Sequence, residues 1–341
     1  MKTLSQFYQS FGVVLVLVCS LLTGCEKVQK KEDEKAFRVG LVLDKGGVDD
    51  RSFNAAAMEG LKLAEKELHI TGKHVEATDD NSFETLIRSF AQRKFDLIVL
   101  IGVSQADALK KIAPQFADRK FVILDAKVNA PNIKSLVFNE HEGSFLVGAL
   151  ASLSSKTGKV GFIGGMDVPI IRRFEMGYSA GAKYIKPQMK VVSNYIGITG
   201  DAWNNPAKAK ELAVTQYNMG ADIVFAAAGA SGAGLFDAAE ENKKLAIGVD
   251  LNQNWVKPGF VLTSMVKRID RAVFQACKDA MEGHFTPGTQ TFGLANQGID
   301  YVIDQYNEKL VSPEQRERLE QIKADIIAGK IKVPDYYKMR K

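Results

Sequence analysis

Residues with carboxylate, amide and aromatic side chains lie close together in one short segment. This segment follows the apolar run that ends at Leu43. Residues 44–54 read DKGGVDDRSFN. The side chains in this segment that can form polar or stacking contacts are Asp44, Asp49, Asp50, Ser52, Phe53 and Asn54. Side-chain oxygens just before a helix can accept hydrogen bonds from its free N–H groups, so helix capping explains part of this set. A phenylalanine at a helix start, among polar groups, also suits a platform on which a flat ligand stacks.

Later segments of the same character follow other apolar runs. Asp125 follows FVIL, and Asp250 follows AIGV. Trp203 and Asn204 lie in a loop of small polar residues, and Lys267 ends the run LTSMV. Trp203 fits the face of a ligand site, and it fits a hydrophobic plug on its own loop equally well.

A glycine run, GASGAG at 229–234, opens another predicted helix. Free N–H groups at a helix start attract anions, so the run could bind a phosphate. It matches neither GxGxxG nor GxxxxGK[ST], the two common phosphate-binding patterns. Close approach of the backbone at Gly229 and Gly232 to a neutral ligand explains the run better.

The chemistry that these residues favour is binding rather than catalysis. Asp44, Asp125 and Asp250 could act as acid and base, and they could equally accept hydrogen bonds from ligand hydroxyls. The sequence contains no GxSxG, HExxH or CxxC motif, and its 4 histidines are scattered without a metal-ligand spacing. Without a nucleophile or a metal we expect no enzyme and no cofactor.

Strands and helices must alternate to place these groups together. The predicted strands are 37–43, 73–77, 96–101, 121–124, 136–138, 159–163, 190–196, 222–227, 245–249 and 261–264. Gly164 and Gly165 are predicted to break the strand before them. Two successive runs of alternating strand and helix favour two doubly wound α/β lobes. Ligands of such sheets bind beyond the carboxyl ends of the strands, so both lobes can face one cleft.

Two helix starts are marked with particular clarity. Asn205 and Pro206 combine a capping side chain with a proline at the first helical position. Ser312 and Pro313 repeat that pattern at a C-terminal helix, and Gln315 stands in the register of a capping box.

Length and composition set the broad class. The chain has 341 residues, which predicts about two domains. Hydrophobic residues make up 46% and charged residues 25%, the ordinary composition of a globular protein. A net charge of +5, from 45 basic and 40 acidic residues, is too small and too dispersed to indicate a nucleic-acid partner.

The N-terminal segment is predicted to be a targeting signal and not part of the folded protein. Residues 1–24 contain the apolar run FGVVLVLVCSLL and end in Leu-Thr-Gly before Cys25. This order resembles a bacterial lipobox and predicts lipid attachment at Cys25, although an ordinary cleaved signal would also account for it. Residues 25–36 are highly charged and predict a solvated tether. Cys277 is predicted to be a small buried hydrophobe.

Six motifs in order carry a family resemblance. They are GGVDDRSFN (46–54), FVILDA (121–126), DAWNNPAKAKE (201–211), ADIVFAAAGASGAG (221–234), IGVDLNQ (247–253) and LTSMVKR (262–268), with GKIKVP (329–334) near the end. Together they resemble the basic membrane protein family of bacterial lipoproteins. The resemblance implies a substrate-binding protein of an ABC transporter that takes purine nucleosides such as guanosine, inosine and adenosine.

The resemblance also implies roles for individual residues. Phe53 and Trp203 would sandwich the base, although the family usually has phenylalanine at the second position. The base edge would be bound by Asp50 and Asn54. Ser52 and Asn204 are further candidates for ligand binding. Asp44 and Asp125 would line the wall of the first lobe. Asp250 and a charge-balanced Lys267 would hold the ribose hydroxyls, and Gly229 and Gly232 would allow close approach. Phe174, with Met166 and Arg172, is a rim candidate, and core or solvated positions explain these three at least as well.

The implied fold is the type I periplasmic-binding fold, with two lobes joined by three crossovers. We expect an N-terminal lobe of 37–157 plus 265–291 and a C-terminal lobe of 158–264 plus 292–341. Ligand would stabilise a hinge-closed form that permease subunits recognise, on a monomer anchored by lipid and facing the periplasm or the cell exterior. Three alternatives remain open: a receptor for another flat hydroxylated ligand such as riboflavin, a signalling or surface lipoprotein, and, more distantly, a nucleoside hydrolase.

Overall fold

The structure, a computed structural model, describes residues 36–339. In the compact unit that begins at Phe37, the chain forms two α/β lobes, and each lobe is built on one sheet of six strands. The predicted signal 1–24, the predicted lipid attachment at Cys25 and most of the predicted tether lie outside the described residues. No helix in the described part of the chain is long and apolar enough to cross a membrane.

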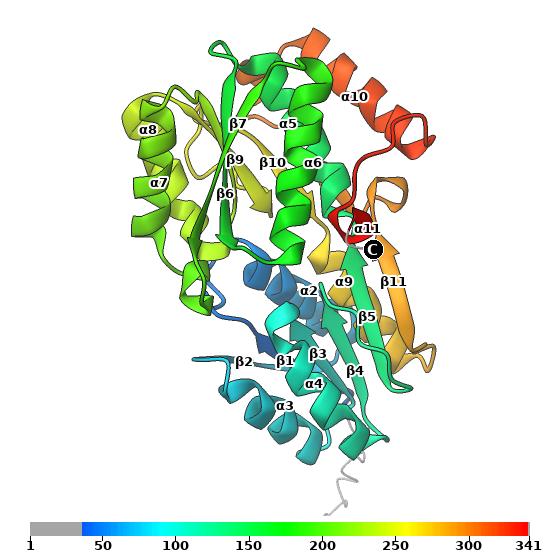
Figure 1. Cartoon of the computed structure of the whole chain (residues 1–341). Coiled ribbons are helices and arrows are strands. Elements are labelled where there is room, and N and C mark those ends of the chain that lie inside the picture. Colours follow the sequence, from blue (N-terminus) through cyan, green and yellow to red (C-terminus); the bar gives the residue numbers. More distant parts are fainter. Residues whose placement is uncertain (1–35, 340–341) are drawn as a thin grey trace, which may run out of the picture. The chain divides into compact units, whose positions relative to one another are not determined.

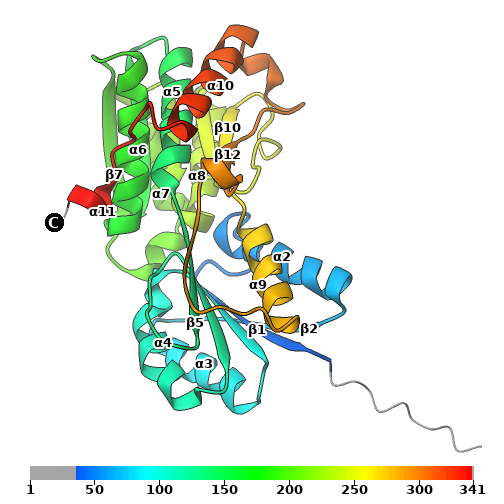
Figure 2. The same ribbon diagram turned by 90° about the vertical axis from the view of Figure 1, so that its right-hand side faces the viewer.

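The first lobe is built on a parallel sheet with the strand order β11-β5-β4-β3-β1-β2. Its strands are β1 (Arg38–Leu43), β2 (Thr71–Glu76), β3 (Leu97–Ile101), β4 (Lys120–Leu124), β5 (Ile133–Phe138) and β11 (Gly288–Phe292). Its helices are α2 (Phe53–Leu68), α3 (Ser82–Gln92), α4 (Ala106–Ile112) and α9 (Ile269–Met281). Apolar side chains of α3 and α4 cover one face of the sheet, and α2 and α9 pack side by side on the other (Figure 2).

The second lobe repeats this plan with the strand order β12-β10-β9-β8-β6-β7, in which only β12 is antiparallel to its neighbour. Its strands are β6 (Lys159–Met166), β7 (Lys190–Gly197), β8 (Ile223–Ala227), β9 (Leu245–Asp250), β10 (Val261–Lys267) and β12 (Ile299–Tyr301). Its helices are α5 (Glu140–Ser154), α6 (Pro169–Ile185), α7 (Pro206–Asn218), α8 (Gly232–Asn242), α10 (Pro313–Ile327) and α11 (Tyr336–Met339). Helices α7 and α8 lie on one face of the sheet and α5 and α6 on the other (Figure 1).

The chain passes between the two sheets at three places: from β5 to α5, from β10 to α9, and from β11 to β12. The predicted lobe boundaries at 157–158, 264–265 and 291–292 stay a prediction. Helix α5, which precedes the first of them, packs against α6, β10 and β12. One continuous apolar cluster runs through residues of both lobes, and it includes Cys277, which is fully buried as expected.

Strand β6 corrects one expectation from the sequence. Gly164 and Gly165 do not end the strand, because Gly164 pairs with Tyr195 of β7 and the ladder continues to Met166. A side chain at Gly164 would collide with the Tyr195 ring, which lies 2.7 Å from the ideal Cβ position. Glycines within a strand often mark such close approach of another group. Strands β11 and β12, polar and short, were not expected at all.

Helices α5 and α6 are held unusually close by glycines. An ideal Cβ on Gly148 would lie 2.1 Å from the Tyr178 carbonyl oxygen, and one on Gly181 would lie 1.9 Å from the Phe145 carbonyl oxygen. Backbone therefore packs directly against backbone, which leaves no space for even a methyl group. This contact fixes the position of helix α6. The N-terminal half of α6 faces the crossover from β5 to α5.

Gly181→Ala is expected to destabilise the protein by about 1–3 kcal/mol, the usual cost of overpacking, because the two helices must separate. The measurement is urea unfolding followed by circular dichroism. Lys183→Ala, an exposed change two residues away on the same helix, is the control and should leave the midpoint nearly unchanged. Equal stability of the Gly181 variant and wild type would contradict the close-packing argument.

Candidate functional site

A cavity of about 250 Å³ lies where the carboxyl ends of the strands of the two sheets meet. Most of the residues singled out from the sequence line it: Asp44, Asp50, Phe53, Asn54, Asp125, Phe174, Trp203, Gly229, Asp250 and Lys267. Lining residues come from both lobes, so a molecule in this cavity contacts both sheets. The rim candidate Met166 lines it too, whereas Arg172 pairs with Asp167 and Glu175.

Three of the singled-out residues do not line the cavity. Ser52 is fully buried, and its hydroxyl donates a hydrogen bond of 2.5 Å to Asp250 of the other lobe. Asn204 is exposed on its loop. Gly232 begins α8, and a Cβ there would meet nothing within 4 Å, so no close approach requires glycine at this position. Gly229 differs, because its φ of +58° is left-handed and favours glycine.

The segment before α2 is a rigid, internally bonded wall. Asp50 caps the helix: its Oδ1 accepts from the backbone N–H groups of Ser52 and Ala55, and its Oδ2 accepts from that of Asn54. Asn54 in turn accepts a hydrogen bond from the Asp44 backbone N–H, at 2.8 Å. Capping thus accounts for Asp50, and it holds the Asn54 amide in one orientation at the cavity. Burial raises the pKa of Asp50.

Asp44 lies on the same wall and is also buried. Its Oδ2 accepts a hydrogen bond from the Ser104 hydroxyl, and its Oδ1 accepts one from the Lys45 backbone N–H. Burial raises the pKa of this carboxyl in spite of both bonds. The sequence reasoning missed Lys45, Ser104 and Gly102, all of which line the cavity. The signal was available, because Gly102 and Ser104 directly follow strand β3 at the same edge of the sheet.

The two aromatic rings are seated against glycines. The Trp203 ring lies over Gly165, where an ideal Cβ would come within 2.2 Å of Cζ3. Phe53 packs near Gly102, whose Cβ would lie 3.6 Å from Cε1 of that ring. The glycine pair in β6, interpreted from the sequence as a strand break, instead makes room for the rings of Tyr195 and Trp203.

Lys267 is a fully buried cation at the cavity wall. Its Nζ donates to Asp125 Oδ2 at 2.6 Å and lies 3.5 Å from Glu140 Oε1. Burial alone would lower the pKa of Lys267, but the carboxylates of Asp125, Glu140 and Asp250 raise it, so the side chain is charged. The sequence predicted Asp250 as the balancing partner. The direct partners are Asp125 and Glu140, because these two project from the elements that flank the end of β10.

Asp125 and Asp250 occupy equivalent places after β4 and at the end of β9. Both have left-handed backbone conformations, with φ of +62° and +66°. Non-glycine residues rarely adopt this conformation, and such local strain gathers at functional sites. Asp125 Oδ1 is buried without a hydrogen-bond partner, which leaves an acceptor free beside the cavity.

Direct contacts close the cleft between the lobes. Ser52 bonds to Asp250, and Gln253 Nε2 donates to the Arg51 carbonyl oxygen at 2.8 Å. The Arg51 guanidinium also lies 5.5 Å from the centre of the Trp255 ring. These polar contacts link the two walls of the cleft.

Comparison with known proteins gives a family match over most of the chain and several relatives. The family model described as "ABC transporter substrate-binding protein PnrA-like" matches residues 37–336. A relative from Lactococcus lactis subsp. cremoris, named "ABC transporter nucleoside-binding protein BmpA", is 36% identical over 321 residues, 87% of this chain and 89% of the relative. A relative from Pyrococcus abyssi, named "Uncharacterized lipoprotein", is 30% identical over 310 residues, 86% of this chain and 76% of the relative.

A solved structure shares the arrangement of both lobes. The solute-binding protein of an ABC transporter system from Aeropyrum pernix K1 superposes with a TM-score of 0.80 at 28% identity. The match covers 87% of this chain and 94% of that protein. The two lobes and their three crossovers are therefore the type I periplasmic-binding fold that the sequence predicted.

Asp250 supplies a prediction about stability. Burial raises its pKa from 3.8 to about 6, against the lowering effect of Lys267 and the Ser52 hydroxyl. The folded state then binds this proton more tightly than the unfolded chain, so the Asp250 contribution to stability falls as the pH rises from about 4 to 6. Above pH 6 the ionised group costs up to about 3 kcal/mol.

Asp250→Asn is accordingly expected to raise the free energy of unfolding of the ligand-free protein at pH 7.5, and to raise it much less at pH 4.5. Urea unfolding at the two pH values measures the difference. Asp107→Asn, on the exposed side of α4, is the matched control and should change stability at neither pH. An Asp250 variant that is less stable than wild type at pH 7.5 would contradict the assignment of a costly buried charge.

Proposed function

This chain belongs to the PnrA-like family of ABC transporter substrate-binding proteins, and from that premise we propose that it binds a purine nucleoside in the cleft between its lobes. The observation that carries the proposal is the pairing, in one cavity, of seated aromatic rings with buried hydrogen-bonding groups. The name of the relative from Lactococcus lactis supports the same ligand class. Binding, and not turnover, is the activity, in keeping with the family.

The base is held by the rings and by the wall before α2. Phe53 and Trp203 supply π-faces, and stacking on such a face contributes about 1–3 kcal/mol per base. Asn54, oriented by Asp44 and Asp50, offers an amide to the edge of the base. A cavity of about 250 Å³ has room for one nucleoside.

The ribose is held by the charged groups at the opposite wall. Asp250 accepts hydrogen bonds from hydroxyl groups, and the Lys267 ammonium donates to hydroxyl oxygens. Asp125 keeps one oxygen free beside Lys267. Because these groups are buried, they bind a hydroxylated ligand strongly and reject a free base that leaves them unpaired.

The bound nucleoside joins groups of both lobes and so stabilises the closed form. The permease subunits of an ABC importer recognise that form. Lipid on Cys25 holds the protein, as a monomer, at the outer side of the membrane through the charged tether. The name of the relative from Pyrococcus abyssi supports this attachment.

Thermal unfolding and isothermal titration of the purified protein, refolded from denaturant to strip any bound ligand, test the proposal. Guanosine, inosine, adenosine, cytidine, ribose and riboflavin are compared. A ligand at 100 times its dissociation constant stabilises the protein by about 2.7 kcal/mol. We expect purine nucleosides alone to do so. A shift with riboflavin only would indicate the flavin-type receptor, and no shift with any compound would refute a nucleoside receptor and favour a surface lipoprotein.

Gly165→Ala tests whether the position of the Trp203 ring matters for binding, without substituting Trp203 itself. The new methyl group would lie 2.2 Å from the ring, so the ring must leave its place in the cavity. Loss of one stacking face predicts affinity for the best purine nucleoside about tenfold to hundredfold weaker, as measured by titration calorimetry.

Gly232→Ala is the matched control for that change. A Cβ at Gly232 meets nothing within 4 Å, and alanine favours the helix that begins there. Its affinity should equal that of wild type. A Gly165 variant that binds as tightly as this control would remove Trp203 from the binding site.

A further inference from the structure

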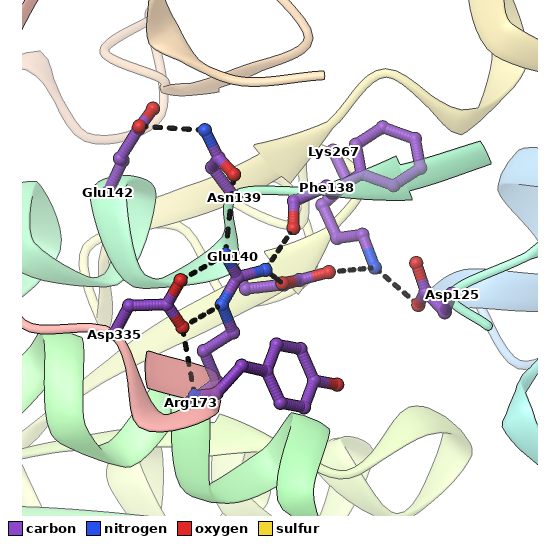
Figure 3. A network of polar contacts seen from close by, with 9 residues as sticks. Asp125, Phe138, Asn139, Glu140, Glu142, Arg173, Lys267 and Asp335 are labelled. Atoms are coloured by element: carbon purple, nitrogen blue, oxygen red, sulfur yellow. Dashed lines mark hydrogen bonds and ion pairs between the residues drawn. The ribbon is translucent and has the colours of Figure 1, made fainter. Parts of the chain in front are cut away.

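A chain of five alternating charges runs from the ligand cavity to the C-terminal segment (Figure 3). Asp125 follows β4, Lys267 ends β10, Glu140 begins α5, Arg173 lies in α6, and Asp335 lies just before α11. The links are Lys267 to Asp125, at 2.6 Å, Lys267 to Glu140, at 3.5 Å, Arg173 to Glu140, at 2.7 Å, and Arg173 to Asp335, at 2.8 Å. Side chains more than 200 residues apart in the sequence are thereby joined.

Every member of this chain is buried. The exposed fractions of the five side chains are 7% for Asp125, 1% for Lys267, 2% for Glu140, 8% for Arg173 and 8% for Asp335. In such surroundings a charge is tolerated only with a well-placed partner, and loss of one partner leaves its neighbour uncompensated. A change at one end of the chain therefore alters the balance of charge along it.

Arg173 connects Asp335 to Glu140 in this series of charges. Its Nε and Nη2 bind the two oxygens of Asp335 at 2.8 and 3.0 Å, a bidentate pair that fixes the plane of the guanidinium. Nη1 is then aimed at Glu140 Oε2 and at the Phe138 carbonyl oxygen. Glu140 divides its carboxylate, with Oε2 on Arg173 and Oε1 facing Lys267.

Only Asp125 and Lys267 of the five line the ligand cavity. We propose that Glu140, Arg173 and Asp335 are positioning residues for ligand binding, which hold the Lys267 ammonium between two carboxylates and so aim it at the ligand. This inference rests on the proposed function. Without the Asp335 charge, Arg173 draws Glu140 toward itself, so Lys267 loses one of its two carboxylates and is no longer held in the position from which it contacts the ligand.

The position of the chain in the fold gives it a second consequence. Glu140 lies just after the first crossover between the lobes, and Lys267 lies just before the second. Asn139 donates to Glu142, and Glu142 accepts a hydrogen bond from the Leu294 backbone N–H in the third crossover. Arg173 Nη2, which binds Asp335, also donates to Asn139 Oδ1 at 3.3 Å, so the C-terminal segment is connected to the first and third crossovers between the lobes.

Asp335→Asn removes the charge and keeps the shape, and titration calorimetry with the purine nucleoside that wild type binds best measures its effect. We expect affinity at least tenfold weaker. Asp335→Glu, which restores the charge, should recover most of it. Asp325→Asn, which removes a carboxylate of α10 that pairs with Lys330, should bind as wild type does. These comparisons separate charge from a general loss of fold.

A double-mutant cycle shows whether the effect passes through Lys267. Because Asp335 acts on the ligand only through that side chain, Asp335→Asn should change affinity little in a Lys267→Met background. A lower melting temperature with unchanged affinity, or an undiminished effect in the Lys267→Met background, would overturn the positioning role. If wild type binds nucleoside and Asp335→Asn binds it equally well, this inference alone fails. A wild-type protein that binds no nucleoside overturns the proposed function, and the inference with it.

Discussion

The structure depends on one constraint: a lysine ammonium is buried where two lobes meet. Lys267 is 1% exposed and sits among the Phe53, Phe138 and Phe174 rings, with Nζ 4.8 to 5.7 Å from their centres. Taking such a charge out of water costs several kcal/mol unless carboxylates surround it. Those carboxylates are Asp125 of the first lobe and Glu140 at the start of α5, just after the first crossover, so the charge is compensated only when both lobes are in place.

The parts of the site that could be predicted from sequence are those fixed by local chain geometry. Asp125 follows β4 of one sheet and Asp250 ends β9 of the other, and ligands of parallel sheets bind at the carboxyl ends of the strands, so two lobes that face one cleft bring both carboxylates to it. Helix starts were equally local: Asn205 caps α7 by accepting from the Lys208 backbone N–H, and Ser312 with Gln315 forms the capping box of α10. Such signals lie within a few residues of the feature they produce.

The parts that could not be predicted depend on residues far apart in the chain. Strand β11, GTQTF, has no apolar pattern, and it is a strand because Gly288 to Phe292 pair with β5 more than 150 residues earlier. Glu140 and Asp335 were not singled out from the sequence. Their roles are set by Arg173 between them, which no spacing in the sequence reveals.

Buried carboxylates outnumber buried ammonium groups along the cavity. Asp44, Asp50, Asp125 and Asp250 all line the cavity, where Lys267 is the buried cation. Burial raises the pKa of each of these carboxyls, so each is held in a state that costs free energy. Asp125 Oδ1 is buried without a hydrogen-bond partner, and a hydroxyl group of a ligand would supply the donor. Under the proposed function, a ligand that contacts both walls favours the conformation in which both walls lie within its reach, and differential contact of this kind is what shifts a population of two conformations.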